Sequence, residues 1–537
     1  MPTFSIDETE IEFAAGQSIL EALDDAGLLM NGVDVPHYCW HPKLAVDGSC
    51  RLCQVEVEGM PKLQIACNTP ALDGMVVRTK TERVSAAREG VMELLLVNHP
   101  LDCPICDQAG ECKLQDYAFE YGVAGSRSRE PRRALAKNVP LGPTIVFDQE
   151  RCILCRRCVR FCREITKTDE LAVVGRGDHS VIETYPGKPL DNAYSMNVAD
   201  MCPVGALTTT DFRFAIRVWF LEDVPGVCTG CATGCNIHLS VANNKVYRYQ
   251  PRRNDDVNDT WICDAGRMSY KEIGAADRIE SASVRNDHGL EPATFEEAIT
   301  AAATRLSAIL EAKGPSVIAG VATAHATNED LFTFRRFLDA LGADIAGVAV
   351  KRGASDDLLI EAEKGANAAG ARAFGFGEAA AVMKQIRSRS VDAVICLGHD
   401  ILEDELLGDT AELVGLDTLI VLDTRQSALL RVAHVVFPAR HAAEKWGTLT
   451  NFEGRVQRVQ PAVTSPSYAH AEGFVLQALG RALALDGFDV PYDARAVSQA
   501  MGRKVQAFAG IDIDSVGDQG RPLLGADSPL PGDARTR

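Results

Sequence analysis

Sixteen of the 17 cysteines in this sequence lie between Cys39 and Cys263, and only Cys396 lies in the remaining C-terminal half. Thiolates are the usual ligands of structural zinc and of iron–sulfur clusters. The other use of so many thiols, a set of disulfides, requires an oxidising compartment. The start MPTFSIDETEIEF has neither the basic nor the apolar region of a secretory leader, so we do not expect such a compartment. The sequence therefore predicts metal ligation, and the spacing of the cysteines divides them into four groups.

The first group is Cys39, Cys50, Cys53 and Cys67, in which a close C-x2-C pair is flanked by two further thiols. Plant-type [2Fe-2S] ferredoxins also combine a C-x2-C pair with a distant cysteine, although the first gap is longer here. Gly48 precedes the pair and allows backbone amides to turn toward the sulfur atoms of a cluster. We expect a [2Fe-2S] cluster; a structural zinc ribbon would use the same four thiolates.

The second group is His99, Cys103, Cys106 and Cys112. Three thiols cannot complete the four sites of a [4Fe-4S] cluster, and the nearest further donor is His99, which follows a predicted helix and precedes Pro100. We therefore expect His99 to be the fourth ligand. A neutral imidazole in place of a thiolate lowers the negative charge of the centre, which favours its reduced state.

The third group begins with Cys152, Cys155, Cys158 and Cys162, which have the C-x2-C-x2-C-x3-C spacing of bacterial ferredoxins. In two-cluster ferredoxins the fourth cysteine of each run ligates the other cluster. The usual Cys-Pro pair appears later, as Cys202-Pro203. We therefore expect a [4Fe-4S] cluster on Cys152, Cys155, Cys158 and Cys202.

Cys162 is expected to be a remnant without a metal. Its partner cluster would need thiols ten, seven and four residues before Cys202, and those positions hold Asn192, Ser195 and Val198. The second cluster of the ancestral pair is therefore predicted to be lost.

The fourth group is Cys228, Cys231, Cys235 and Cys263, for which we expect another [4Fe-4S] cluster, again with zinc as the alternative. Cys396 differs from all of these, because it lies in the apolar segment DAVICLG, where a buried and inert thiol is expected.

One further pattern imitates a dinucleotide fingerprint, in Gly375, Gly377 and Ala380. The residues before it, GANAAGARAF, do not form a strand pattern, so the required structural context is missing. We predict no nucleotide site there.

The elements that must position these groups change in character along the chain. Near the N-terminus, two short strands, a polar turn at Asp7 and a helical pattern over 18–26 suit a β-grasp-like module, and a helix over 83–98 leads into the second group. Residues 123–144 are rich in Gly, Ser, Arg and Pro and are predicted to be a linker. After 274, helices alternate with apolar strands at 316–322, 392–398, 417–423 and 433–438, which indicates a mostly parallel, doubly wound sheet.

The predicted fold class is therefore a multidomain α+β protein. Its predicted parts are a [2Fe-2S] ferredoxin-type domain (1–82), a His/Cys3 [4Fe-4S] domain (83–122), a ferredoxin-like [4Fe-4S] domain (145–212), a further [4Fe-4S] domain (217–273), a doubly wound α/β domain (274–521) and a disordered tail (522–537).

Composition excludes several classes of function. The hydrophobic fraction of 46% and charged fraction of 24% are those of a globular protein with real cores. The net charge of −19 repels nucleic acid, so nucleic-acid binding is not expected. No apolar run is long enough for a spanning helix, so we expect the chain to be cytoplasmic and to meet a membrane only through partners.

The motifs YCWHPKLAVDGSCRLC, VNHPLDCPICDQAGECKLQD, the Cys152 run and DMCPVGAL occur in an order and spacing that resemble the large iron–sulfur subunit (the G subunit) of NADH:quinone oxidoreductase, respiratory complex I. The resemblance covers residues 1 to about 275. It implies a redox subunit of that enzyme, not catalytic alone, which relays electrons from a flavin-bearing subunit toward quinone through one [2Fe-2S] and three [4Fe-4S] clusters.

The resemblance also implies an electron order, partners and a location. Electrons would pass from the [2Fe-2S] cluster to the Cys152 cluster and then to the His99 cluster, with the fourth cluster off the main path. The partners would be the flavin-bearing and other peripheral-arm subunits of complex I, on the cytoplasmic side of the bacterial inner membrane, without direct insertion.

The C-terminal half resembles the molybdopterin oxidoreductases, notably in AHVVFPARHAAEKWGTLTNFEGRVQ. Those enzymes usually follow the last cluster cysteine with a Lys-Gly-Arg type sequence, whereas Ala265 occupies the lysine position here. No cysteine other than Cys396 is available as an axial metal ligand. We therefore expect a degenerate scaffold without molybdopterin.

Three other interpretations remain open from the sequence. A catalytic formate dehydrogenase or related molybdopterin oxidoreductase would bind molybdenum or tungsten. An iron hydrogenase shares the first modules but needs further cysteines for its catalytic cluster. A zinc-organised scaffold would have no redox role and would be colourless.

Overall fold

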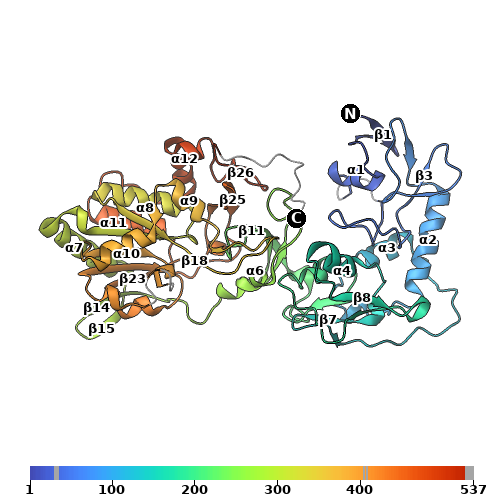
Figure 1. Ribbon diagram of the computed structural model, residues 1–537, viewed down its shortest axis with the longest axis horizontal. Helices are drawn as coiled ribbons and strands as arrows, with labels where there is room; N and C mark the ends of the chain where they lie inside the picture. Colours follow the sequence, from blue (N-terminus) through green and yellow to red (C-terminus); the bar gives the residue numbers. More distant parts are fainter. Residues whose placement is uncertain (30–34, 403–405, 407–408, 526–537) are drawn as a thin grey trace. The chain divides into compact units, whose positions relative to one another are not determined.

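The computed structural model describes residues 1–29, 35–402, 406 and 409–525. The chain forms two compact units, Met1–Leu221 and Glu222–Arg537, and each is described by itself. Figure 1 labels their elements in chain order. Within the described residues, no helix is both long and apolar enough to cross a bilayer.

The first unit opens with a five-stranded sheet of order β2-β1-β5-β3-β4. Its strands are β1 (Thr3–Ile6), β2 (Thr9–Glu12), β3 (Gln54–Val57), β4 (Gln64–Ile65) and β5 (Val76–Arg78). Helix α1 (Ile19–Asp25) begins at the cap Ser18 and packs Ile19, Leu20 and Leu23 into the core of this sheet. The β1–β2 turn passes through Asp7, which has a positive φ of 49°. The predicted β-grasp-like module is confirmed.

The next segment is helical. Helix α2 (Glu82–Leu96) starts at the cap Thr81, close to the predicted start at 83. The short η1 (Cys103–Ile105) and helix α3 (Lys113–Tyr121) follow, and α2 packs against both α3 and β3. These helices place the second cysteine group beside the first sheet.

The ferredoxin-like part combines short strands with short helices. Its elements are β6 (Val139–Pro140), β7 (Ile145–Phe147), η2 (Gln149–Arg151), α4 (Arg157–Arg160), the π-helix η3 (Phe161–Ile165), β8 (Leu171–Val174), η4 (Gly177–His179), β9 (Val181–Thr184), α5 (Asn197–Asp200), β10 (Leu207–Thr209) and η5 (Val218–Phe220). Strand β7 pairs with both β6 and β10. Strand β6 lies inside the predicted 123–144 linker, whose end therefore belongs to this sheet.

The second unit opens with an antiparallel meander, β11 (Glu222–Val227), β12 (Asn236–Ala242) and β13 (Lys245–Pro251). Helix α6 (Asp264–Met268) and η6 (Ser269–Glu272) follow it. Residues 217–221, which the sequence assigned to this module, instead belong to the first unit, where Arg217 donates to the carbonyl oxygen of Cys106.

An eight-stranded sheet of order β15-β14-β23-β22-β21-β16-β17-β20 forms the centre of the second unit. The strands are β14 (Ala282–Asn286), β15 (Gly289–Ala293), β16 (Ile318–Thr323), β17 (Ile345–Ala349), β20 (Gly377–Glu378), β21 (Ala393–Leu397), β22 (Thr418–Asp423) and β23 (Val435–Pro438). The six strands from β23 to β20 are parallel, and β14 pairs antiparallel with β23 on one side and with β15 on the other.

Both faces of this sheet are buried. Its helices are α7 (Phe295–Lys313), α8 (Asn328–Leu341), α9 (Ala368–Ala373), α10 (Ala379–Arg387), α11 (Glu472–Ala482) and α12 (Ala494–Lys504). Ile395 packs in the core with α7, α8, α11 and α12, while the neighbouring Cys396 packs in the second core with α10. This alternation confirms the doubly wound fold (Figure 1).

Smaller elements complete the second unit. They are β18 (Lys351–Arg352), β19 (Glu363–Lys364), β24 (Gly447–Thr450), β25 (Arg455–Val459), β26 (Arg521–Pro522), η7 (Pro315–Val317), η8 (Asp400–Leu402), η9 (Ala411–Leu413), η10 (Ala428–Arg431), η11 (Ala442–Glu444) and η12 (Gln506–Phe508). The predicted tail starts at 522, but Pro522 pairs with Arg455 and the amide of Leu524 donates to Ala507. Residues 526–537 lie outside the described residues.

Candidate metal centres

The four thiols of the first group lie together. Cys39 is hydrogen-bonded through sulfur to Cys50 and Cys67, and Cys53 is hydrogen-bonded to Cys67. Cys53 and Cys67 flank the paired strands β3 and β4, and the amide of Ala66 donates to the carbonyl oxygen of Cys53 at 2.9 Å. We call this set the first centre.

Gly48 acts in the first centre as the sequence suggested. It has a φ of +64°, a conformation that L side chains rarely adopt. The backbone amides of Ser49 and Cys50, just after it, bond the sulfur of Cys39. These contacts supply positive dipoles to the sulfur atoms of an anionic cluster.

The second centre comprises His99, Cys103, Cys106 and Cys112. Cys106 and Cys112 are buried, whereas Cys103 is exposed. Charges on Cys103 and Cys106 both raise the pKa of Cys112. His99 differs from the cysteines, because no cysteine of this centre is among the main causes of the shift in the pKa of His99.

The ring of His99 is nevertheless suited to a ligand. Burial lowers the pKa of His99 to about 4, so the imidazole is neutral at physiological pH. Its Nδ1 atom is buried and has no hydrogen-bond partner in the described structure. An unpartnered lone pair of this kind is costly unless a metal or another group satisfies it.

The third centre comprises Cys152, Cys155, Cys158 and Cys202. The pKa of Cys158 is raised in part by the charges of Cys152, Cys155 and Cys202. The charge of Cys155 likewise raises the pKa of Cys202. Cys152 and Cys155 lie in a loop with left-handed turns at Leu154 and Arg156, Cys158 lies in helix α4, and Cys202 follows helix α5. The structure thus brings Cys202 to the consecutive run across 43 intervening residues.

Cys162 faces a different environment. It is fully buried in the π-helix η3, and its sulfur is bonded by the amides of Leu171 and Glu170 on the far side of the loop. Cys162 raises the pKa of Cys158 less than the three other cysteines do. It is not among the main causes of the pKa shifts of Cys152 or Cys202.

The positions that would have held the lost cluster are filled by protein contacts. Asn192 donates to Glu170, which also accepts from Thr168 at 2.8 Å and lies beside Cys162. Ser195 shares a 2.8 Å hydrogen bond with Thr144, and Val198 is fully buried. A carboxylate and its donors therefore occupy the surroundings of Cys162.

The fourth centre comprises Cys228, Cys231, Cys235 and Cys263, all buried in the second unit. The amide of Cys228 donates to the carbonyl oxygen of Cys235 at 2.8 Å, which closes the loop between β11 and β12. Cys263 caps helix α6 by accepting the amide of Gly266 at 3.3 Å. Ala265, at the position of the family's lysine, is exposed.

The centres share a backbone device that the sequence alone did not reveal. At seven of these cysteines the amide two residues later bonds the sulfur; those amides belong to Leu52, Gln108, Leu114, Leu154, Arg157, Val204 and Gly230. Hydrogen bonds to ligand sulfurs are a main determinant of iron–sulfur potentials. Cys162 lacks this arrangement, since its donors come from eight and nine residues away.

Burial alone makes these thiols poor anions. It raises the pKa of Cys152 and Cys202 to about 12 and that of Cys112 to about 11. A metal must supply the positive charge that keeps such groups as thiolates. In the part of the chain that the structure describes, no three His, Cys, Asp or Glu side chains converge as ligands of a single ion. The cluster assignment therefore depends on the donor set and its surroundings.

Glycines leave space beside the sulfur atoms. A Cβ on Gly205 would lie 2.2 Å from the sulfur of Cys106, and a Cβ on Gly266 would lie 2.9 Å from that of Cys228. Both distances are closer than real Cβ atoms approach. The cysteine sulfur atoms of the second and fourth centres therefore approach glycine backbone so closely that no larger residue fits there.

Contacts join the three centres of the first unit. Arg151, next to Cys152, forms an ion pair of 2.7 Å with Asp102, next to Cys103. The carbonyl oxygen of Pro203, next to Cys202, accepts the thiol of Cys112 at 3.8 Å. Tyr38, next to Cys39, reaches the carbonyl oxygen of Lys113 at 3.5 Å. The third centre thus borders the second, and the first borders both.

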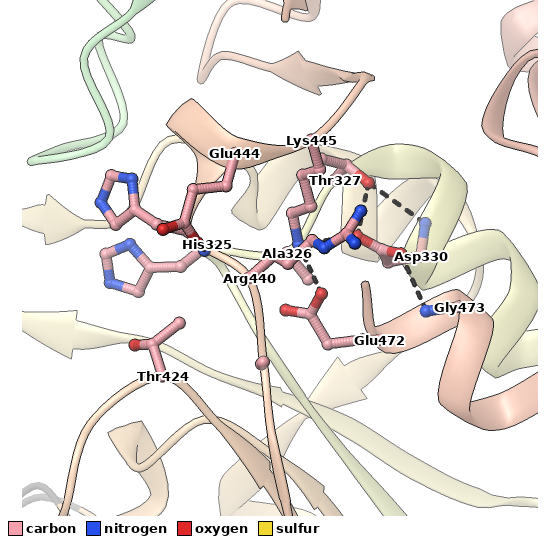
Figure 2. Close-up of polar contacts among 12 residues, drawn as sticks. His325, Ala326, Thr327, Asp330, Thr424, Arg440, Glu444, Lys445, Glu472 and Gly473 are labelled. Atoms are coloured by element: carbon pink, nitrogen blue, oxygen red, sulfur yellow. Dashed lines mark hydrogen bonds and ion pairs between the residues drawn. The ribbon is translucent and has the colours of Figure 1, made fainter. Parts of the chain in front are cut away.

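In the doubly wound domain, a buried charge network joins Lys445, the residue after η11, to helices α8 and α11 (Figure 2). The ammonium of Lys445 contacts Asp330 at 2.8 Å and also contacts Glu472. Burial alone would lower the pKa of Lys445, but these two carboxylates raise it above its usual value. Asp330 also accepts the amide of Gly473 at 2.8 Å, so the network joins α8 to the start of α11.

A cavity of about 380 Å³ lies at the carboxyl ends of the parallel strands. Its lining includes Thr323, His399, Thr424 and Arg440, which end or follow β16, β21, β22 and β23. Open parallel sheets bind ligands at this edge. The sequence predicted none of these lining residues.

Two smaller predictions can be compared with the structure. Cys396 lies on β21 and is fully buried, as predicted. The segment directly before Gly375 is helix α9 and not a strand.

Five family models match the chain in order. They are "2Fe-2S iron-sulfur cluster binding domain" (1–82), "NADH-ubiquinone oxidoreductase-G iron-sulfur binding region" (88–127), "NADH-quinone oxidoreductase subunit 3, ferredoxin-like domain" (142–208), "NADH-ubiquinone oxidoreductase NDSU1/NuoG-like, 4Fe-4S domain" (223–271) and "Molybdopterin oxidoreductase" (359–481). These matches confirm the predicted fold class and show that domains of both the 2Fe-2S and the 4Fe-4S binding types are present.

Individual relatives agree with the families. The G subunit of NADH-quinone oxidoreductase from Rickettsia bellii is 38% identical over 344 residues, 64% of this chain and 49% of that protein. The mitochondrial NADH-ubiquinone oxidoreductase 78 kDa subunit of Candida albicans is 39% identical over 65% of this chain and 47% of that protein. The resemblance predicted from the sequence is confirmed, and the chain spans about half the length of these curated relatives.

A solved structure is also similar in part. One chain of an NAD⁺-reducing [NiFe]-hydrogenase is 32% identical, with a TM-score of 0.36, and the match covers 40% of this chain and 91% of that chain.

Proposed function

We propose that this chain is the electron-transfer iron–sulfur subunit of an NADH:quinone oxidoreductase, relaying electrons from a flavin-bearing partner toward quinone and not catalytic alone. The observation that supports the proposal is that fifteen cysteines lie in four groups, in the order of the matching family models. His99 completes the second group as a proposed ligand, supported by its buried and unpartnered Nδ1 atom. Each cluster would accept and pass on one electron at a time.

The proposed ligands are the residues of the four centres. Cys39, Cys50, Cys53 and Cys67 would hold a [2Fe-2S] cluster. Three [4Fe-4S] clusters would be held by His99, Cys103, Cys106 and Cys112; by Cys152, Cys155, Cys158 and Cys202; and by Cys228, Cys231, Cys235 and Cys263. No molybdopterin is proposed.

The protein's own role is to bury the donors, aim amides at their sulfur atoms and keep the centres close together. The contact of Arg151 with Asp102 supports a route from the third centre to the second. The hydrogen bond from Arg160 to the carbonyl oxygen of Cys39 supports the step before it, from the first centre to the third. The fourth centre belongs to the second compact unit, and we propose that it lies off the main path.

The proposed partners are the flavin-bearing and other peripheral-arm subunits, on the cytoplasmic side of the bacterial inner membrane. Exposed apolar side chains near the second centre support such a docking surface; they are Leu101, Ile105, Phe214, Trp219 and Phe220. The segment that carries the last three packs on this centre, because the amide of Phe214 donates to Asp107 at 2.7 Å.

Metal analysis and low-temperature EPR of the reduced protein test the proposal. We expect about 14 iron atoms per chain, no zinc, one binuclear signal and three tetranuclear signals. The variant His99→Ala should lose or remodel only the second centre. A fully loaded protein with stoichiometric zinc, or with eight to ten irons, would remove at least one assignment.

The alternative of a catalytic formate dehydrogenase is not favoured. The relatives are named as complex I subunits, and an exposed Ala265 stands where molybdopterin enzymes have lysine. Stoichiometric molybdenum or tungsten in the purified protein would reverse this judgement.

A further inference from the structure

The loop between Cys39 and Cys50 is held by the helical segment that follows Cys155. Arg160 donates from Nη1 to the carbonyl oxygen of Ala45 and from Nη2 to that of Cys39. The amide of Ala45 in turn donates to Glu164 at 2.8 Å. The first and third centres therefore share a contact surface in which side chains of one bind the backbone of the other.

Two arginines contact both centres directly. Arg160 Nη2 also donates to the carbonyl oxygen of Cys155 at 3.4 Å. Arg157 donates from Nη2 to the carbonyl oxygen of Trp40, next to Cys39, and from Nη1 to that of Met201, next to Cys202, at 3.1 Å. Each guanidinium thus bridges one ligand segment of the first centre and one of the third.

Neither of these two charges pairs with a carboxylate in the part of the chain that the structure describes. Arg160 is 8% exposed and Arg157 is partly buried, and among the described residues no carboxylate lies within ion-pair distance of either. All the contacts above are to neutral carbonyl oxygens. The Nε atoms of both arginines are buried and without a hydrogen-bond partner. A buried charge in this situation is strongly unfavourable unless an anion compensates it.

The compensating anions are available on both sides. The charged form of Arg157 is stabilised most by the thiolates of Cys155, Cys202 and Cys39. A cluster bound to four thiolates is a net anion in either oxidation state. We propose that Arg157 and Arg160 are the shared counterions of the first and third centres, and that they raise the reduction potential of both.

The physical reason for the direction is simple. Reduction adds a negative charge to a cluster, and a nearby positive charge stabilises the reduced form more than the oxidised form. Because both arginines lie against both centres, their loss should make both centres harder to reduce. Among the described residues, neither side chain donates to a ligand segment of the second centre, which should keep its potential, and we expect the same of the fourth centre.

The test uses the full-length, iron-loaded protein and redox titration followed by EPR. In Arg157→Gln and Arg160→Gln we expect the reduced-to-oxidised ratio at the first and third centres to fall at least tenfold at a fixed potential, a shift of about 59 mV. Arg156→Gln is the matched control, since Arg156 touches the same loop through Asp47 at 2.6 Å but is exposed. It should leave all four potentials unchanged.

The inference depends on the proposed function, and their failures can be told apart. Wild-type protein without iron would remove the proposed function. Loaded glutamine variants with unmoved potentials, or with all four potentials moved equally, would overturn only the counterion role. If the glutamine variants do not load the first and third centres, Arg157→Lys and Arg160→Lys decide: loading restored by the retained charge supports the role, and equal failure of lysine and glutamine overturns it.

Discussion

At the scale of single residues, the groups that surround each thiol determine whether it is suited to bind a metal. Cys202 lies with the consecutive run and has the amide of Val204 on its sulfur, whereas Cys162 lies beside Glu170 and takes its donors from distant residues. A negative carboxylate opposes the thiolate that a metal requires. Two cysteines that a motif search treats alike therefore have different surroundings.

We expect Cys202→Ala to abolish the third centre and Cys162→Ala to leave it intact. The alanine at 162 should cost only about 1 kcal/mol of unfolding free energy, since it removes a buried packing contact. Iron content and the EPR spectrum of each variant provide the measurement. Loss of the third centre from the Cys162 variant, with its retention in the Cys202 variant, would reverse the assignment.

A histidine in the second unit should titrate far from its usual range. The hydrogen bond to Asp423, 2.8 Å long, raises the pKa of His399 from 6.5 to about 9. Since the folded pKa lies above the unfolded one, the stabilisation is fully present below about pH 6.5 and is lost as the pH rises through 9. The side chain is 45% exposed, so the effect on unfolding is small.

NMR titration of the His399 ring measures this directly, and Asp423→Asn is the control that should return the pKa toward 6.5. A pKa near 6.5 in the unaltered protein would show that the ion pair does not form in solution.

At the scale of elements, the loop after α5 serves two centres at once. It carries Cys202 for the third centre, and Gly205 passes so close to Cys106 that no side chain fits. We expect Gly205→Ala to lose or distort the second centre, because a Cβ at 2.2 Å from the sulfur forces the loop to move. Gly125→Ala is a matched control with nothing within 4 Å of its Cβ. Iron content and the EPR signal of the second centre would be unaffected in both variants if this loop did not shape the site.

The network of Lys445 makes the corresponding prediction for the doubly wound domain. Lys445→Met would leave Asp330 and Glu472 buried without their cation, and we expect this to cost about 3–5 kcal/mol of unfolding free energy. Lys384→Met is the control, since Lys384 is exposed on α10. Denaturant unfolding of both variants compares them, and equal midpoints would contradict a structural role for the network.

At the scale of the whole molecule, the sequence predicts what depends on local spacing and misses what depends on long-range contacts. The C-x2-C pairs, the helix capped by Ser18 and the apolar strand around Cys396 all have local signals, and the structure contains each of them. The hydrogen bonds of Arg160 to Ala45 and Cys39 span 115 and 121 residues, and no local sequence pattern predicts them. The same holds for Glu170, whose partner Asn192 the sequence marked only as a missing ligand.

The whole chain should be a carrier of electrons and not a binder of NADH. The segment around Gly375 follows a helix, α9, and not the strand that a dinucleotide fold requires. We expect no binding of NADH by the isolated, iron-loaded chain in calorimetry, and no NADH oxidation until a flavin-bearing partner is added. Tight binding by the chain alone would contradict this.

The shared loop of residues 202–206 also has a consequence for biogenesis. Anchoring of Cys202 by the third centre would fix Pro203 and Gly205 against Cys112 and Cys106. Maturation should therefore be hierarchical, with the third centre filled before the second. When the apo-protein is reconstituted with iron and sulfide, the signal of the second centre should appear after a lag that tracks the third, and in Cys202→Ala it should form slowly or not at all.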